Sequence, residues 1–436
     1  MTHKPVSAVD VHAWGTWVGR IAQDPGTGFY AFAYTPDWQQ RGIELAPFQM
    51  PLSNEPYEFL ELSPATYYRL PAVFADALPD RFGNALVDAW MSENGVAQED
   101  VTPLDRLAYA GDRAMGALTF RPPAGPALDE PGILQVADLV VAARRAVRGD
   151  ATTEAGLTDA LRQLIQVGTS AGGARAKAVI LFNEETQQIR SGHAPDEPGF
   201  AHYLLKLDGV SASGMDGRLD GLGTGASYGR IEYAYYLMAT GAGVTMEESR
   251  LLLEGPRAHF LTRRFDRGPA GERHHVITLC ALSHLDFNLP AAHSYDQYLD
   301  AVRRLGLDAG AMAQAFRRMV FNVVAVNRDD HTKNLGFRLR ERSGWELAPA
   351  YDVTHAYNAQ GEWTQRHQMR VNGKNDGITL EDLHAVGDRN DVPGYKRIVR
   401  EVLAAVAAWA DFAADAGVPE RETRKIAADL DRFRPR

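Results

Sequence analysis

Three polar side chains in the last third of the sequence have the types and spacing that metal-assisted phosphoryl transfer requires. Asn334 follows Asp329 by five positions, and Asp352 comes eighteen positions after Asn334. In this chemistry the protein places a base in line with the attacking hydroxyl, and metal ions neutralise charge. Asp329 could be the base, and Asn334 and Asp352 carry the oxygens that Mg²⁺ prefers. A polar loop in which Asp and Asn only bond backbone groups explains the same pair and stays open here.

Length and composition indicate a large acidic globular protein. The 436 residues exceed one ordinary core, so two or three packed units are expected. The formal net charge of −10 argues against a broad nucleic-acid-binding face, and any DNA contact is expected through a partner protein. Cys280 is the only cysteine, which excludes an internal disulfide and favours a reducing compartment. Without a signal-peptide core or a membrane-length apolar run, a cytoplasmic protein is predicted.

The hydrophobic pattern predicts strands and helices in three consecutive segments. Alternation at 9–13, 17–21 and 30–34 predicts short strands, followed by helical signals at 79–91 and 103–109 and a strand at 117–120. The Pro- and Gly-rich stretch 121–126 is the clearest linker and closes a first segment, 1–125. Helices at 134–147 and 157–166, strands at 177–181, 187–189, 203–207 and 259–261, and a helix at 231–239 fill the second, 126–268. The third, 269–436, is mainly helical, at 295–305, at 309–326 and after 393.

A loop of small residues introduces the first strand of the middle segment. Gly168, Gly172 and Gly173 precede the strand that begins near Lys177, and glycine lets backbone amides approach phosphate oxygens closely. The loop is not a P-loop, because Lys177 is flanked by alanines. Ser170 inside the loop could be a hydroxyl acceptor. A flexible connector explains the same composition.

Lys206 lies in an otherwise apolar strand, 204–207. A lysine there must find water or an anion, because burial of an unpaired ammonium costs several kcal/mol. A nucleotide phosphate would be suitable, and an edge-strand lysine that points outward is the alternative. Glu232, early in the next helix, is the nearest candidate to orient Lys206, although a surface glutamate fits as well. The segment 264–267 follows a strand and would form a hinge between lobes, where backbone groups could meet adenine.

In this order and spacing, the motifs resemble the HipA family of toxin–antitoxin serine/threonine kinases over nearly the whole chain. Similar stretches are the amino-terminal signatures at 74–80 and 115–120, the Gly-rich loop at 170–177, the hinge at 264–267, the catalytic loop at 329–334 and the metal strand at 351–352. The resemblance implies an α+β, two-lobed protein-kinase-like fold with an extra strand-rich amino-terminal subdomain and a helical carboxy-terminal lobe. The subdomain would be 1–125, the kinase N-lobe 126–268 and the C-lobe 269–436.

The resemblance also implies roles for the residues of the catalytic loop. Asp329 would be the catalytic base, and Asn334 and Asp352 would hold magnesium. His331 and Lys333 would shape the loop or steady the γ-phosphate.

On the nucleotide side, the resemblance implies that Lys206 contacts the α/β-phosphates of ATP. Arg263 and Phe265 would offer backbone groups to adenine, and Asp266 would lie near the ribose. Arg263 stands where the family commonly has glutamate, which matters little for a backbone contact. The loop residues expected at the cofactor are Ser170, Gly172, Gly173 and Lys177. Ser170 would also be autophosphorylated, with ejection of the loop and loss of ATP binding.

The implied function is that of an ATP- and magnesium-dependent serine/threonine kinase acting as a toxin. A small HipB-like helix-turn-helix antitoxin would neutralise it and bind DNA on its behalf, and an aminoacyl-tRNA synthetase or similar protein would be its substrate. A kinase-like nucleotide-binding protein without transfer activity and a small-molecule kinase are the alternatives. Residues 361–374 look like a subgroup signature, for which a substrate role, a loop-ordering role and a structural loop all fit.

Overall fold

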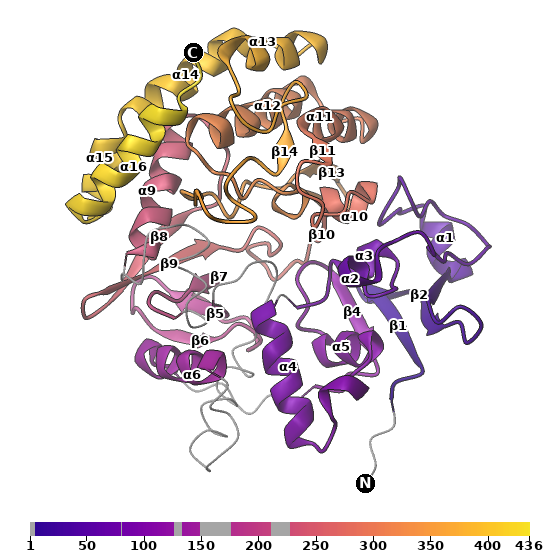
Figure 1. Cartoon of the computed structure of the whole chain (residues 1–436). Helices are drawn as coiled ribbons and strands as arrows, with labels where there is room; N and C mark the ends of the chain where they lie inside the picture. The colour runs from indigo at the N-terminus through magenta and orange to yellow at the C-terminus, as the bar shows by residue number, and fades with distance from the viewer. Residues whose placement is uncertain (1–4, 80, 126–132, 149–175, 211–226) are drawn as a thin grey trace. The chain divides into compact units, whose positions relative to one another are not determined.

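The computed structural model describes residues 5–79, 81–125, 133–148, 176–210 and 227–436, and its elements are labelled in Figure 1. They divide into two compact units that interleave along the sequence. Unit 1 comprises residues 1–205, 263–286 and 338–344, and unit 2 comprises 206–262, 287–337 and 345–436. These units do not coincide with the three consecutive segments predicted from the sequence. In the described part of the chain, no helix combines the length and apolar character needed to cross a membrane.

An antiparallel sheet with strand order β3-β2-β1-β4 begins unit 1. Its strands are β1 (Ala8–Ala13), β2 (Thr16–Gln23), β3 (Tyr30–Tyr34) and β4 (Leu118–Arg121). Val9 opposes Ile21 and Val11 opposes Phe120, and all four side chains are buried. The alternation that predicted these strands therefore reflects one buried face of the sheet.

Short helices and a second group of strands complete unit 1. The helical elements are α1 (Pro36–Arg41), α2 (Pro64–Tyr67), α3 (Ala72–Ala75), α4 (Arg81–Glu93), η1 (Gln98–Asp100), α5 (Pro103–Ala110), α6 (Val136–Arg148) and α10 (Leu279–Ser283). The strands are β5 (Lys177–Asn183), paired antiparallel with β6 (Ile189–Ser191), β7 (Phe200–Lys206), whose last residue belongs to unit 2, and β10 (His275–Thr278). The predicted helix at 157–166 lies outside the described residues.

Helices are the main regular elements described in unit 2, as predicted for the carboxy-terminal segment. They are α9 (Tyr228–Gly241), α11 (Tyr295–Arg304), α12 (Ala309–Val324), η2 (Thr332–Asn334), α13 (Leu380–Arg389), α14 (Tyr395–Ala407), α15 (Trp409–Asp415) and α16 (Glu420–Phe433). Helix α14 packs against α12 and α9, and α15 packs against α9 and α16 (Figure 1). These helices enclose a core that includes Tyr235, Phe321 and Trp409.

The strands of unit 2 are short. They are the hairpin β8 (Ser249–Glu254) and β9 (Arg257–Arg263), the parallel pair β11 (His293–Ser294) and β14 (Met369–Arg370), and parts of β12 (Gly336–Arg340) and β13 (Gly344–Leu347). The boundary between the units falls inside β12, after Phe337, and also just before the last residue of β9, Arg263.

Part of the segment 361–374 orders the start of a helix. Asn372 and Gly373 have positive φ angles of 51° and 80°, as a type I′ turn requires, and Val371 and Lys374 exchange backbone hydrogen bonds of 2.8 and 3.0 Å. Asn372 Nδ2 and Lys374 Nζ donate to the carboxylate of Asp382 at 2.9 and 2.8 Å. Asp382 is the third residue of α13 and completes its capping box. This part of the segment therefore has a structural role.

We expect Asp382→Asn to destabilise the fold near neutral pH and to matter less in acid. Burial raises the pKa of Asp382, but hydrogen bonds from Lys374 and Asn372 outweigh it and lower the pKa to about 2. A carboxyl with a depressed folded pKa adds stability above its unfolded pKa of about 3.9 and loses it as the pH falls. Denaturant unfolding should show a smaller difference in the free energy of unfolding between wild type and variant at about pH 3 than at about pH 6. A difference that does not change with pH would contradict this prediction.

Candidate active site

The backbone at residue 356 holds the residues just before the predicted catalytic loop, 329–334. Just after α12, Val326 is fully buried with a φ of 54°, a left-handed conformation that is costly for a β-branched residue. The N–H of Ala356 donates to the carbonyl of Val326 at 3.2 Å, and the N–H of Arg328 donates to the carbonyl of Ala356 at 3.1 Å. Such conformations persist where the surroundings fix them, and they cluster at functional sites.

A buried arginine anchors the same loop to the carboxy-terminal helix. The Arg328 guanidinium lies 3.9 Å from the ring centroid of Phe433 at the end of α16, and its Nη2 is 3.1 Å from Asp376 Oδ1. Arg328 is buried, whereas Asp376 is half-exposed. The residue before Asp329 is therefore held by stacking and by an ion pair.

The loop then folds back on itself through Asn334. Nδ2 of Asn334 donates to the backbone carbonyl of Asp329 at 2.7 Å, which fixes the amide plane and turns the side-chain oxygen away from that bond. The side chain of Asp329 is 49% exposed, and its Oδ1 lies 3.7 Å from Nε2 of His331. An accessible carboxylate on a fixed backbone suits a base that must reach a substrate hydroxyl.

His331 and Lys333 share one aromatic neighbour. The ring centroid of Phe287 lies 5.4 Å from that of His331 and 4.7 Å from Nζ of Lys333. These contacts on Phe287 fit the loop-shaping role expected of both residues.

Lys206 makes ion pairs with two acidic residues from other parts of unit 2. Its Nζ donates to the carboxylates of Glu232, in α9, and of Asp352. Burial lowers the pKa of Lys206, but the two carboxylates outweigh it and raise the pKa above the usual value. Glu232 is 3% exposed, so it is not the surface glutamate that was the alternative. Lys206 likewise does not point outward from an edge strand.

A direct bond joins the segment of Asp352 to the catalytic loop. The hydroxyl of Tyr351 donates to the carbonyl of Lys333 at 2.7 Å. Tyr351, Val353 and Asn334 also line one small cavity of about 20 Å³. Asp352 itself has a φ of 52°, which aspartate tolerates better than most residues. Unit 2 therefore brings Lys206, Glu232 and the segment of Asp352 together, and attaches that segment to the loop of Asp329 and Asn334.

Lys206→Met should lower the free energy of unfolding. The change leaves Glu232 and Asp352 without their shared cation, and we expect a loss of about 2–3 kcal/mol, below the range for fully buried pairs because the Asp352 side chain is 22% exposed. Urea unfolding measures this loss. Adding Glu232→Gln to Lys206→Met should recover part of it, because one uncompensated charge is then removed. A Lys206→Met protein as stable as wild type would contradict this account of the ion pairs.

The donor set fits a magnesium ion that is held jointly with a nucleotide. In the described part of the chain, no group of three or more His, Cys, Asp or Glu side chains could hold a metal ion by itself. Mg²⁺ at phosphoryl-transfer sites is usually bound by one or two protein ligands, by phosphate oxygens and by water. The carboxylate of Asp352 and the side-chain oxygen of Asn334 are suitable ligands for that arrangement.

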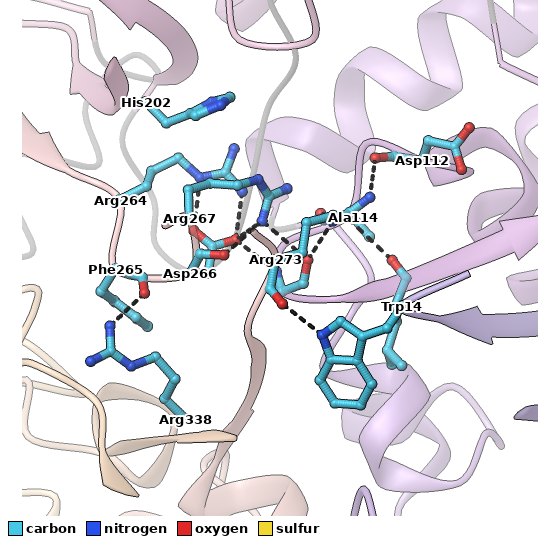
Figure 2. Close-up of polar contacts among 12 residues, drawn as sticks. Trp14, Asp112, Ala114, His202, Arg264, Phe265, Asp266, Arg267, Arg273 and Arg338 are labelled. Carbon is cyan, nitrogen blue, oxygen red and sulfur yellow. Dashed lines mark hydrogen bonds and ion pairs between the residues drawn. The ribbon is translucent and has the colours of Figure 1, made fainter. Parts of the chain in front are cut away.

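The predicted hinge residues belong to unit 1, where Asp266 lies among arginine side chains (Figure 2). Its carboxylate is fully buried and accepts hydrogen bonds from Arg264 at 2.9 and 2.6 Å, from Arg267 at 2.6 Å and from the N–H of Gly116 at 2.8 Å. Burial raises the pKa of Asp266, but the two arginines outweigh it and hold the pKa far below the usual range. These donors make the Asp266 carboxylate the centre of an ion-pair cluster inside unit 1, and its contact with the ribose stays a prediction.

Arg273 continues this cluster toward the amino-terminal sheet. Its guanidinium donates to the backbone carbonyls of Asp112, Ala114, Gly116 and Leu118, between 3.0 and 3.4 Å, and its own carbonyl accepts the indole N–H of Trp14 at 2.7 Å. Figure 2 shows Arg273 together with Asp112, Ala114 and Trp14. The loop before β4 is therefore ordered by arginines that come more than 150 positions later in the sequence.

Apart from Lys206, the other predicted nucleotide-side residues also lie in unit 1 or outside the described part of the chain. Arg263 is the last residue of β9, and the carbonyl of Phe265 accepts a hydrogen bond from Arg338 Nη1 at 2.6 Å (Figure 2). Lys177 begins β5 and is buried. Ser170, Gly172 and Gly173 lie outside the described residues.

Fold and site together define a mixed α/β protein of the kinase-like class, as the sequence predicted. The HipA N-terminal domain model matches residues 9–121, and the HipA-like C-terminal domain model matches residues 169–433. The chain belongs to the HipA family.

A solved structure has the same fold. A structure described as the Shewanella oneidensis MR-1 toxin–antitoxin system HipA, HipB and its operator DNA complex aligns with a TM-score of 0.66 and 16% sequence identity, over 98% of this chain and 95% of that chain. The proinflammatory kinase CtkA of Helicobacter pylori aligns with a TM-score of 0.33 and 11% identity, over 57% of this chain and 94% of that chain. Among curated proteins, none matches.

Proposed function

We propose that the chain is an ATP- and magnesium-dependent serine/threonine protein kinase and the toxin of a HipA–HipB-like module. The observation that carries the proposal is the double ion pair of Lys206 with Glu232 and Asp352, in the same unit as the loop of Asp329 and Asn334. A lysine paired with a helix glutamate, together with an Asp-x4-Asn loop and a later aspartate, is the set of residues by which kinases bind phosphates and metal. The HipA family membership supports the same reading.

Each of these residues has a defined task in the transfer. Asp329 accepts the proton of the attacking hydroxyl, and its half-exposed side chain is open to a protein substrate. Asn334 and Asp352 hold magnesium, which supplies charge neutralisation at the phosphates. Lys206 contacts the α/β-phosphates, and Glu232 keeps its ammonium in place. His331 and Lys333 fix the shape of the loop over Phe287.

Residues of unit 1 and of the Gly-rich loop bind the rest of the nucleotide in this proposal. The backbone groups of Arg263 and Phe265 meet adenine, and Lys177 with the loop residues Ser170, Gly172 and Gly173 faces the phosphates. Ser170 is also the site of autophosphorylation, which limits activity because a dianion among phosphate-binding amides competes with the phosphates of ATP.

The partners follow from the family and from the charge of the chain. A HipB-like helix-turn-helix antitoxin binds the protein and supplies the DNA contact, which agrees with a net charge of −10 on the kinase chain. The Shewanella complex contains HipA, HipB and operator DNA. The protein substrate is an aminoacyl-tRNA synthetase or a protein of similar function, and the site of action is the cytoplasm.

Labelled ATP tests the proposal directly. The purified full-length chain, incubated with γ-labelled ATP and Mg²⁺, should incorporate phosphate on Ser170, as located by mass spectrometry. The label should disappear when EDTA removes magnesium, and Ser170→Ala should lose that site while still phosphorylating an added protein substrate.

Two outcomes would replace the proposal with another function. Magnesium-dependent ATP binding without any transfer would indicate a regulatory nucleotide-binding protein. Phosphate found only on metabolites would indicate a small-molecule kinase.

A further inference from the structure

Asp330, next to the proposed base, has a buried carboxylate that the proposed reaction does not use. The residue is 1% exposed. Its Oδ2 accepts hydrogen bonds from the hydroxyl of Tyr295 at 2.8 Å and from Nδ1 of His367 at 3.0 Å. Its Oδ1 accepts the backbone N–H of Gln368 at 2.7 Å. One carboxylate thus binds helix α11 on one side and residues 367–368 on the other.

Residues 367–370 are held in place from a second direction as well. The N–H of Ala291 donates to the carbonyl of Gln368 at 2.8 Å, and β14 pairs in parallel with β11, with Met369 opposite His293. Tyr295, which donates to Asp330, directly follows β11 as the first residue of α11. The strand pair and Asp330 therefore fix the same short segment relative to the same helix.

The polar network continues to the beginning of the catalytic loop. Nδ2 of Asn322 donates to the hydroxyl oxygen of Tyr295 at 3.0 Å, and Nδ2 of Asn327 donates to Oδ1 of Asn322 at 2.9 Å. Both asparagines are buried. Asn327 and Asp330 are thus joined through Tyr295 and Asn322, so the network spans α11, α12, the loop and residues 367–368.

A buried carboxylate needs all of its hydrogen-bond donors, because a carboxylate oxygen without a partner costs free energy in a nonpolar interior. Two of the three donors to Asp330 come from residues 367–368. Displacing that segment would leave Asp330 under-bonded, and turning Asp330 would move the backbone of the adjacent Asp329. A misplacement of about 1 Å at a reacting group can cost about 10²-fold in rate.

We propose that Asp330 is a positioning residue that couples the segment 364–371 to the orientation of Asp329. The inference rests on the proposed kinase function for its effect on rate, whereas the coupling itself is a property of the fold. In this proposal, the part of the segment 361–374 that ends with β14 orders the catalytic loop. The Asn372–Gly373 turn that follows serves helix α13 instead.

Asp330→Ala tests the coupling, with kinetics and hydrogen exchange as readouts. We expect kcat to fall about 10²-fold while the KM for ATP changes less than about twofold, because the nucleotide contacts are untouched. Hydrogen exchange should speed up in both 329–334 and 364–371, but not in the sheet β1–β4 of unit 1. An effect on folding alone would lower the active fraction and leave kcat per ATP-binding site unchanged.

Variants of the donors guard against a misfolded Asp330→Ala protein. Tyr295→Phe and His367→Ala should each give a smaller version of the same kinetic and exchange changes. Each should add little when combined with Asp330→Ala, because all three act through one carboxylate. His367→Asn, which restores a donor, should recover most of the rate lost in His367→Ala. His384→Ala, on α13 in the same unit, is the matched control and should leave kcat unchanged.

The exchange measurement separates the inference from the proposed function. If the wild-type chain transfers no phosphate, the proposed function fails, yet coupled exchange of 329–334 and 364–371 would still support the coupling. If Asp330→Ala and His367→Ala leave the exchange of 364–371 as in wild type, the inference is overturned even in an active kinase.

Discussion

Asp329→Asn should reduce phosphate transfer by about 10³-fold and leave the affinity for ATP within about twofold, because a general base contributes about 10²–10⁴ to the rate. The substitution is nearly isosteric and keeps the backbone carbonyl that accepts the hydrogen bond of Asn334. The side chain is 49% exposed, so removing its charge leaves no buried partner unpaired. Single-turnover transfer of labelled phosphate measures the rate, and calorimetry with ATP and Mg²⁺ measures the affinity.

The control for this prediction is another accessible carboxylate in unit 2. Asp300 lies on α11 with a side chain that is 52% exposed, and Asp300→Asn should transfer phosphate at the wild-type rate. Equal rates of phosphate transfer for Asp329→Asn and the wild-type chain would show that Asp329 is not the base.

Asp266→Asn should lower the free energy of unfolding by about 3–5 kcal/mol, the range for breaking a buried ion pair by removing one partner. The side chains of Arg264 and Arg267 are 1% and 10% exposed, so neither regains full hydration when the carboxylate is lost. Burial lowers the pKa of Arg267 to about 9 even with Asp266 present. The N–H of Gly116 would also face a weaker acceptor. Urea unfolding with a probe in unit 1 measures the loss.

Asp112, beside the same cluster in Figure 2, provides the comparison. Its side chain is 54% exposed and forms an ion pair of 3.0 Å with Arg121. Exposed pairs of this kind contribute at most about 1 kcal/mol, so Asp112→Asn should unfold nearly as the wild type does. Equal losses for Asp112→Asn and Asp266→Asn would show that burial of the cluster is not what makes it stabilising.

The local pattern of the sequence was sufficient for most elements and for the closeness of Asp329 and Asn334. Strands such as β1 follow from alternation at Val9 and Val11, and helices such as α12 from a regular apolar stripe. Asp329 and Asn334 are close in sequence, so a short spacing already relates them. The Asn372–Gly373 pair is itself a sequence signal for a tight turn, and both residues have positive φ angles. The pattern of the segment 361–374 did not decide between its possible roles.

Contacts between distant residues could not be predicted in the same way. The role of Asp266 depends on Gly116, 150 positions earlier, and nothing in the local sequence distinguishes a buried aspartate among arginines from one that faces a ribose. Asp330 likewise receives its donors from Tyr295 and from residues 37 and 38 positions later. Spacing predicted the pairing of Asp329 with Asn334, but only the tertiary structure gives the network around their loop.

The interleaved course of the chain has a consequence for synthesis on the ribosome. Unit 1 is not complete until residue 344 has been made, because 263–286 and 338–344 belong to it. Until Arg273 has been made, the carbonyls of Asp112 and Ala114 lack its guanidinium as a donor, and the ring of His275 cannot yet contact the carbonyl of Leu45. An amino-terminal fragment cut at residue 125 would therefore lack these bonds permanently, and in the nascent chain the first sheet gains them only after Arg273 and His275 have been made.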